Sequence, residues 1–304
     1  MLYRRFGTTG VEVSSQCLGA MTFGKMGDTD PDDCVRIVER ALDAGINFID
    51  TADVYSGGQS EEIVGRAVRT RRERVVLATK CYYPMGADRN DQGSSRRWII
   101  RAVEASLRRL GTDYIDLYQM HKPDWDTDPE ETLSALSDLV RQGKVLYLGS
   151  SSFPADWIVE SQWAAARRNS ERFVYEQPQY SIFARSIETS ILPACQRHRM
   201  SVIAWSPLAG GWLTGKYRRD EQRHRPGGPA GYGYARNRPL PPIPLAATGG
   251  PPTHRSPDRT HPADLTRTLE PGRPSTPPGR PVVSTTCSSL RILAPEYQHA
   301  EQRG

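Results

Sequence analysis

The chain of 304 residues has no long hydrophobic run. No stretch approaches the roughly 18 consecutive apolar residues that a membrane-spanning helix needs, so no membrane partner is expected. The N-terminal segment MLYRRFGTTG lacks the apolar core of a secretory signal peptide. These absences predict a cytoplasmic protein.

Cysteine and glycine motifs are also missing. The five cysteines form no Cys-x-x-Cys pair and no spacing typical of metal ligands, so we expect no metal site. We expect the cysteines to be free thiols in a reducing compartment. No Gly-x-Gly-x-x-Gly follows the first predicted strand, which counts against a Rossmann-type sheet.

Lysine is scarce, because only five of the 40 basic residues are lysines. A lysine at a chemically meaningful position is therefore more informative than usual. The net charge is +5, but no basic run is interleaved with aromatic residues outside the C-terminal segment, so we expect no nucleic-acid partner. The oligomeric state is not predicted.

The composition changes near residue 218. Residues 218–304 contain 16 of the 24 prolines, no lysine and no phenylalanine, and their apolar residues follow no period. Such a segment buries too little apolar surface to offset the entropy of ordering it. We expect a folded unit over residues 1–217 and a disordered tail rich in proline, arginine and glycine over residues 218–304.

Residues 1–217 alternate between apolar runs and amphipathic stretches, which is typical of α/β proteins with a parallel sheet. Asp30 is predicted to cap the first helix, and Ser60 the second. The predicted strands span 17–21, 46–52, 74–80, 114–121, 144–152, 172–179 and 201–207, and the predicted helices span 31–45, 60–70, 94–111, 128–143, 154–168 and 186–199. A doubly wound sheet and a (β/α)8 TIM barrel both fit, but the regular spacing favours the barrel. We expect it to be incomplete, with about seven recognisable strands.

Polar residues stand at the C-terminal ends of successive predicted strands. They are Asp50, Lys80, His121, Ser151 with Ser152, Gln177, and Trp205 with Ser206. In a barrel these ends converge on one mouth, where active sites are built. A buried charge needs a partner, and the simplest arrangement pairs Asp50 with Lys80. Tyr55 follows Asp50 closely, whereas Asp53 is expected to be structural or exposed to solvent.

Tyrosine, lysine, aspartate and histidine together suit a proton donor for a carbonyl oxygen. A tyrosine with its ordinary pKa of about 10 is a poor acid at neutral pH, and a neighbouring lysine cation lowers that pKa. Reduction of the carbonyl would also need a hydride, which no side chain supplies, so a nicotinamide or a flavin is implied.

The motifs GINFIDTADVY, VVLATK, DLYQMH, LGSSSF, EQPQYS and AWSPLAGGWLTGKY resemble those of the aldo-keto reductase superfamily. The similarity covers about residues 3–217, and it is greatest to bacterial members similar to potassium-channel β subunits. The resemblance implies a (β/α)8 barrel that reduces a small aldehyde or ketone with NADPH. It also implies that Tyr55 is the acid, Lys80 lowers its pKa, Asp50 pairs with Lys80, and His121 orients the carbonyl.

The resemblance assigns further residues to the cofactor. Ser151, Ser152 and Gln177 would hold the nicotinamide carboxamide, with Ser152 in place of the family's asparagine. Trp205 would stack on the nicotinamide ring. The other implied cofactor residues are Gly19, Ala20 and Asp50 near the first two strands, and Ser206, Pro207, Leu208 and Lys216 around the pyrophosphate.

The resemblance stops soon after Lys216, where the family would continue with an eighth strand and a binding segment for the 2′-phosphate. We interpret this as an atypical or frame-shifted C-terminus. Two alternatives to an active reductase therefore stay open. One is a non-catalytic cofactor-binding or regulatory protein, and the other is an incomplete barrel with impaired catalysis.

Overall fold

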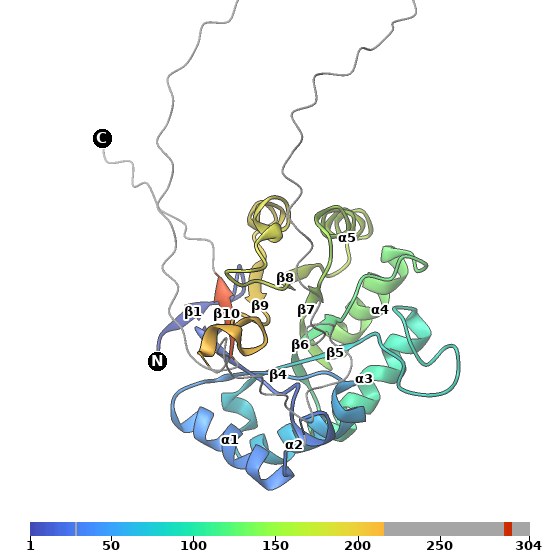
Figure 1. The fold of residues 1–304 in the computed structure, drawn as a ribbon. Coiled ribbons are helices and arrows are strands. Elements are labelled where there is room, and N and C mark those ends of the chain that lie inside the picture. The colour runs from blue at the N-terminus through green and yellow to red at the C-terminus, as the bar shows by residue number, and fades with distance from the viewer. Residues whose placement is uncertain (28, 216–288, 294–304) are drawn as a thin grey trace, which may run out of the picture. The chain divides into compact units, whose positions relative to one another are not determined.

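A barrel of parallel strands forms the centre of the fold (Figure 1). The computed structural model describes residues 1–27, 29–215 and 289–293. Each strand from β3 to β9 pairs in parallel with the next one along the chain. These strands are β3 (Gln16–Gly19), β4 (Phe48–Asp50), β5 (Val76–Cys81), β6 (Ile115–Met120), β7 (Val145–Ser151), β8 (Phe173–Gln177) and β9 (Ser201–Ala204).

The eighth position of the barrel is taken by a strand that runs the opposite way. Strand β10 (Ser289–Leu293) pairs antiparallel with both β3 and β9 and thereby closes the ring. The prediction of an incomplete (β/α)8 barrel with seven recognisable strands is confirmed by β3–β9. The rest of the predicted disordered tail, residues 218–288 and 294–304, lies outside the described residues, as does Lys216.

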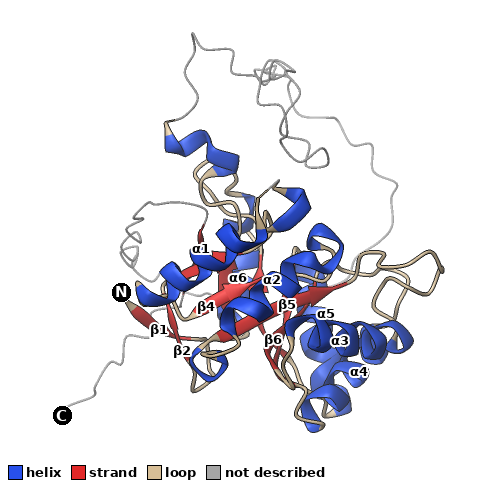
Figure 2. Cartoon of the chain, turned by 90° about the horizontal axis from the view of Figure 1, so that it is seen from below, coloured by secondary structure: helices blue, strands red, loops and turns tan. Residues whose placement is uncertain are grey.

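The described part of the chain forms six α-helices. They lie outside the barrel, as Figures 1 and 2 show. They are α1 (Pro31–Asp43), α2 (Gln59–Val68), α3 (Arg96–Leu110), α4 (Pro129–Arg141), α5 (Ala155–Arg168) and α6 (Ile191–Arg197). Short 3-10 helices span Gly24–Met26, Tyr55–Gly58, Arg72–Arg74, Ser186–Glu188 and Ala209–Thr214. The helix predicted over 186–199 is therefore two pieces, and Pro193 lies in the first turn of α6, where its missing N–H costs no helical bond.

Most helix ends follow from local sequence. Asp30 caps α1 as predicted, because its carboxylate accepts from the backbone N–H groups of Asp32 and Asp33. Helix α3 ends at Gly111, which has the left-handed conformation that glycine adopts without strain. The prediction for Ser60 is wrong, since α2 begins at Gln59 and the Ser60 hydroxyl donates to the Ala20 carbonyl instead.

The apolar core has two parts. The larger part lies between the strands and the outer helices, and the smaller one fills the barrel interior. Phe6, Phe48 and Tyr175 are fully buried in the interior, with the Phe6 ring centroid 5.2 Å from Tyr175 and 5.9 Å from Phe48. Phe6 directly follows the first strand of a short hairpin, β1 (Tyr3–Arg5) with β2 (Glu12–Ser14), which was not predicted from the sequence.

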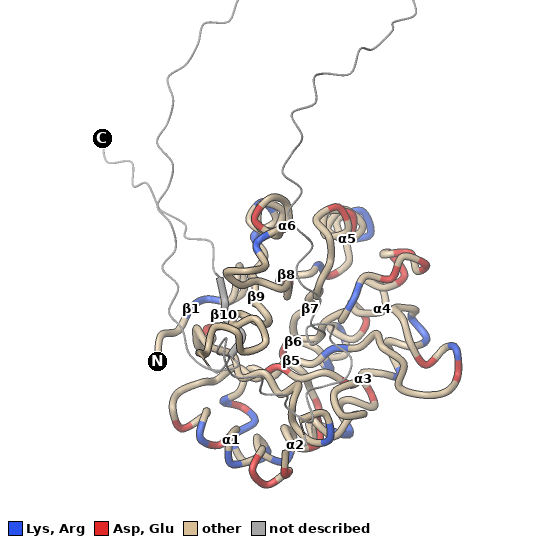
Figure 3. The backbone as a smooth tube through the Cα atoms, in the orientation of Figure 1, with Lys and Arg blue, Asp and Glu red and all other residues tan. Residues whose placement is uncertain are grey.

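The outer helices carry charged residues of both signs (Figure 3). Among the residues described, no helix is both long and apolar enough to cross a membrane. The described residues also contain no group of three histidine, cysteine or acidic side chains that could hold a metal ion.

Candidate active site

The ends of the parallel strands bring the predicted site residues to one end of the barrel. Asp50 is the last residue of β4 and lies in register with Gly19 of β3. Lys80 of β5 pairs in register with Gln119 of β6. Ser151 and Gln177, the last residues of β7 and β8, also pair in register. The parallel register therefore gathers residues that are up to 127 positions apart in sequence.

Lys80 and Asp50 form a buried ion pair, as predicted. The ammonium Nζ lies 2.5 Å from Asp50 Oδ2 and also donates to the Thr51 carbonyl over 2.8 Å. Asp50 Oδ1 accepts from the side-chain amides of Gln119 and Gln177 at 2.8 and 3.0 Å. An ion pair that is removed from solvent needs such further hydrogen bonds to offset its desolvation. The carboxylate is therefore held by three donors in one orientation.

Tyr55 lies beside this pair. Its hydroxyl is 3.4 Å from Lys80 Nζ, and the same ammonium lies 5.1 Å from the centre of the Tyr55 ring. A cation at this distance favours the ionised form of a phenol. Lys80 therefore connects the carboxylate of Asp50 with the hydroxyl of Tyr55.

His121 follows β6 and faces the same group. Its ring packs edge-on against Tyr55 at 5.7 Å between centroids and against Tyr83 at 4.9 Å. Burial, and then the cations of Lys80 and Lys122, hold the pKa of His121 well below its ordinary value. Its Nδ1 is buried and has no hydrogen-bond partner among the described residues. A neutral imidazole with an unengaged nitrogen is suited to a hydrogen bond with a small polar ligand.

The predicted nicotinamide residues lie at the ends of β7, β8 and β9. The Ser151 hydroxyl donates to the Gln177 carbonyl over 3.0 Å, and the Ser152 N–H donates to the same carbonyl over 3.1 Å. Ser152 has a left-handed backbone with φ of 57°. Trp205 is half-buried and forms a parallel bridge with Gln179, which joins the loops after β8 and β9.

The other predicted cofactor residues lie at the ends of β3 and β9. Ala20 is buried next to Asp50, because its N–H donates to the Asp50 carbonyl over 2.8 Å. Ser206, Pro207 and Leu208 are half-buried in the loop after β9, at the edge of the described chain. Lys216 lies just beyond that edge.

Two further polar residues of this region are fully buried. Gln119 is fully buried and bonds Asp50, yet it stands within an apolar strand and was not singled out. The sequence feature that could have indicated Gln119 is its spacing of two residues from His121, which places both side chains on one face of the strand. Asp53 was expected to be structural or exposed to solvent; it is fully buried, which excludes the exposed alternative, and burial, followed by the charge of Glu61, raises its pKa well above the ordinary value.

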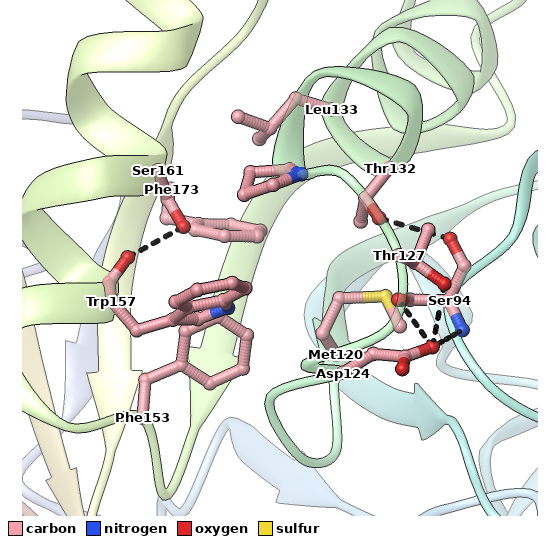
Figure 4. A pocket seen from close by; sticks show the side chains of 11 residues that line it. Ser94, Met120, Asp124, Thr127, Thr132, Leu133, Phe153, Trp157, Ser161 and Phe173 are labelled. Carbon is pink, nitrogen blue, oxygen red and sulfur yellow. Dashed lines mark hydrogen bonds between the residues drawn. The ribbon is translucent and has the colours of Figure 1, made fainter.

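The loop that follows His121 is held by a single carboxylate. Asp124 Oδ2 accepts from the N–H and the hydroxyl of Ser94 at 2.8 and 2.9 Å and from the Thr127 hydroxyl at 2.9 Å (Figure 4). On the other side of this small pocket, Trp157 and Phe153 lie together (Figure 4). The pocket contains none of the predicted site residues, so it is distinct from the candidate active site.

The sequence of this chain is similar to those of known proteins. A sequence model of the Aldo/keto reductase family matches residues 16–237. The oxidoreductase YrpG of Bacillus subtilis, described as uncharacterized, is 45% identical over 228 residues, which cover 71% of this chain and 69% of that protein. A probable voltage-gated potassium channel subunit beta of Arabidopsis thaliana is 40% identical over 222 residues, 71% of this chain and 67% of the relative. Versiconal hemiacetal acetate reductase of Aspergillus parasiticus is 38% identical over 238 residues, 70% and 69% of the two chains.

Proposed function

Because the chain belongs to the Aldo/keto reductase family, we propose that it reduces a small aldehyde or ketone with NADPH, with Tyr55 as the proton donor. One observation carries this proposal. The Tyr55 hydroxyl, the Lys80 ammonium and the Asp50 carboxylate form a continuous chain inside the barrel mouth. Residues 1–217 would form the catalytic part of the chain.

Tyr55 has the surroundings that a proton donor to a carbonyl oxygen needs. Lys80 stabilises the phenolate that forms when the hydroxyl gives up its proton, and Asp50 keeps Lys80 charged and in place. His121, held neutral by its burial, would donate a hydrogen bond to the same carbonyl oxygen. The substrate oxygen would thus lie between the Tyr55 hydroxyl and the imidazole.

The residues at the ends of β7–β9 fit a nicotinamide. The half-buried indole of Trp205 offers a flat apolar surface, and the polar side chains of Ser151 and Gln177 suit a carboxamide. Ser152 would join them, while Gly19, Ala20 and the segment Ser206–Leu208 would lie along the rest of the cofactor. When bound, NADPH supplies the hydride that adds to the carbonyl carbon.

The test is turnover of a reactive aldehyde by the full chain, followed as loss of NADPH absorbance. Tyr55→Phe is expected to lower kcat by at least about 100-fold, the scale of general acid catalysis. It should leave the quenching of tryptophan fluorescence by NADPH nearly unchanged. Tyr3→Phe is the matched control, since it removes a hydroxyl that bonds Gly45 far from the site. Unchanged turnover in Tyr55→Phe would exclude this mechanism.

A second function has one observation in its favour, the similarity to a probable potassium channel subunit beta. On that alternative the chain would bind NADPH without reducing carbonyls at a useful rate. Saturable fluorescence quenching by NADPH in a protein that turns over none of a panel of reactive aldehydes would favour it.

A further inference from the structure

The turn that carries Tyr55 has an unusual backbone. Ser56, Gly57 and Gly58 follow Tyr55 with φ values of 51°, 66° and 98°, all in the left-handed region. Gly57 and Gly58 adopt this conformation without strain, but Ser56 keeps it only where the surrounding structure imposes it. The position of the Tyr55 hydroxyl therefore depends on what holds this turn.

Arg109 holds the turn from one side. This residue lies near the C-terminal end of α3, and its side chain packs directly against Gly58. A Cβ atom added to Gly58 would lie 2.7 Å from Arg109 Cδ, closer than real Cβ atoms approach, and 3.0 Å from Nε, which is also a tight contact. The glycine and the arginine stem thus occupy complementary space.

Glu61 connects Arg109 to the strand that carries Lys80. Its side chain is fully buried, and Oε2 accepts from Arg109 Nε over 2.6 Å. Its other oxygen, Oε1, accepts from the Thr79 hydroxyl over 2.6 Å. Thr79 directly precedes Lys80 in β5. One carboxylate therefore ties together the turn after Tyr55, helix α3 and the strand of Lys80.

We propose that the ion pair between the buried Glu61 and the partly buried Arg109 is a positioning device that sets the 3.4 Å separation between the Tyr55 hydroxyl and the Lys80 ammonium. This inference rests on the proposed role of Tyr55 as proton donor. Neither Glu61 nor Arg109 touches the reacting groups; both act through the backbone on which Tyr55 and Lys80 are carried.

The chemistry of the cluster supports a positioning role over a purely stabilising one. A buried ion pair contributes little net stability compared with apolar residues of similar volume. The desolvation cost is greater in this cluster, because Asp53 is also fully buried there. Neither of its carboxylate oxygens has a hydrogen-bond partner among the described residues. A role in positioning Tyr55 and Lys80 explains why charged residues occupy this cluster, although apolar residues would fill it at a lower cost in free energy.

The consequence for Tyr55 is electrostatic. If the turn shifts, the Lys80 cation lies farther from the phenol, and Tyr55 then ionises at higher pH. The other titratable groups that face Tyr55 or lie on its turn are Asp50 of β4, His121 after β6 and Asp53. Asp53 also responds to the two substituted positions, because the charge of Glu61 raises its pKa and that of Arg109 lowers it. The double variant removes both of these opposing charges, so a change in the ionisation of Tyr55 in that variant would report its position.

The experiment compares Arg109→Met, which keeps the apolar stem, with Arg109→Lys, which keeps the charge. The double variant Glu61→Gln/Arg109→Met removes both charges and leaves no unpaired buried ion. Arg108→Met, a neighbouring exposed arginine of α3, is the matched control. Two readouts are recorded for each full-length protein: the pH dependence of kcat with the aldehyde, and the ultraviolet titration of Tyr55, obtained as the difference from the same protein carrying Tyr55→Phe.

We expect Arg109→Met and the double variant to lower kcat by about 10- to 100-fold, the scale of a misplacement near 1 Å. The ionisation step of Tyr55 should move to higher pH while NADPH quenching stays unchanged, and Arg109→Lys should restore part of both. Folded variants with the wild-type Tyr55 titration would overturn the inference, as would failure of all three variants to fold while Arg108→Met folds. If Tyr55→Phe keeps full turnover, the proposed function fails instead, and the titration still decides whether the pair positions Tyr55.

Discussion

The ammonium of Lys80 and the carboxylate of Asp50 form an ion pair of 2.5 Å in which the lysine side chain is completely shielded from solvent. The pair joins neighbouring strands, β4 and β5, at their C-terminal ends. Its position gives it two functions at once. It connects the strands, and it supplies the positive charge beside Tyr55.

Asp50→Asn is expected to destabilise the protein by about 3–5 kcal/mol, because it leaves the Lys80 ammonium buried without a counter-charge. The free energy of unfolding, measured with urea, checks this. Asp43→Asn is the control, since Asp43 is 63% exposed in its ion pair with Arg71 and should contribute about 1 kcal/mol or less. Equal losses in the two variants would contradict the role assigned to Asp50.

Gly149→Ala is expected to overpack the barrel interior. Its Cβ would lie 2.1 Å from Cζ of Tyr175, whose ring is fully buried and cannot move outward. Overpacking of this kind costs about 1–3 kcal/mol. The free energy of unfolding should fall accordingly in urea titrations. Gly10→Ala, with no atom within 4 Å of the new Cβ, should have little effect.

A double-mutant cycle tests the same contact from the other side. In Gly149→Ala/Tyr175→Leu the smaller leucine removes the clash, so the double variant should lose less stability than the sum of the two single variants. Additive losses would mean that the Gly149 position is restricted by something other than the Tyr175 ring.

Most of the site residues that the sequence predicted stand at or just after the end of an apolar run. Asp50, Lys80 and His121 interrupt the pattern at the same point of successive β/α units, and the barrel geometry then brings them together. The helices were predicted for a similar reason, since residues such as Asp30 and Gly111 mark helix ends locally.

The features that were missed depend on contacts between distant segments. Glu61 and Arg109 are 48 residues apart, and nothing in the spacing of either one indicates the other. Ser60 has the side chain of a helix cap, but the Ala20 carbonyl, 40 residues away, takes its hydrogen bond. Tertiary contacts overrode the local preference in this case. The β1–β2 hairpin was missed because its strands of three residues are too short to show a period.

Glu176 is expected to make stability fall as the pH rises. Its carboxyl is fully buried, accepting from the Ser150 hydroxyl and the Phe153 N–H, and burial raises its pKa from 4.5 to about 8. The unfolded chain releases this proton near its ordinary pKa, whereas the folded chain keeps it until about pH 8. Between these values the folded state binds more protons, so the free energy of unfolding decreases with pH by up to about 1.4 kcal/mol per unit.

Glu176→Gln removes this dependence. The variant should gain stability relative to the wild-type protein between about pH 5 and pH 8, as measured by urea unfolding at a series of pH values. Glu188→Gln is the control, because the ion pair with Arg185 lowers the pKa of Glu188 and so places its titration below this range. A difference between wild type and Glu176→Gln that stays constant with pH would show that Glu176 is ionised in the folded protein.

His121 should have the opposite effect, on the acidic side. Burial and the cations of Lys80 and Lys122 lower its pKa well below the ordinary value of 6.5, so the folded protein keeps it neutral. The unfolded chain takes up a proton below about pH 6.5, and the free energy of unfolding therefore falls as the pH decreases from that point.

His121→Gln cannot be protonated, so its stability relative to wild type should rise as the pH is lowered from about 7 to 5. His198→Gln should show the same trend more weakly, because His198 is less strongly shifted. If wild type and His121→Gln lose stability in parallel over this range, His121 is protonated in the folded state and its assignment as a neutral hydrogen-bond donor to the carbonyl oxygen is wrong.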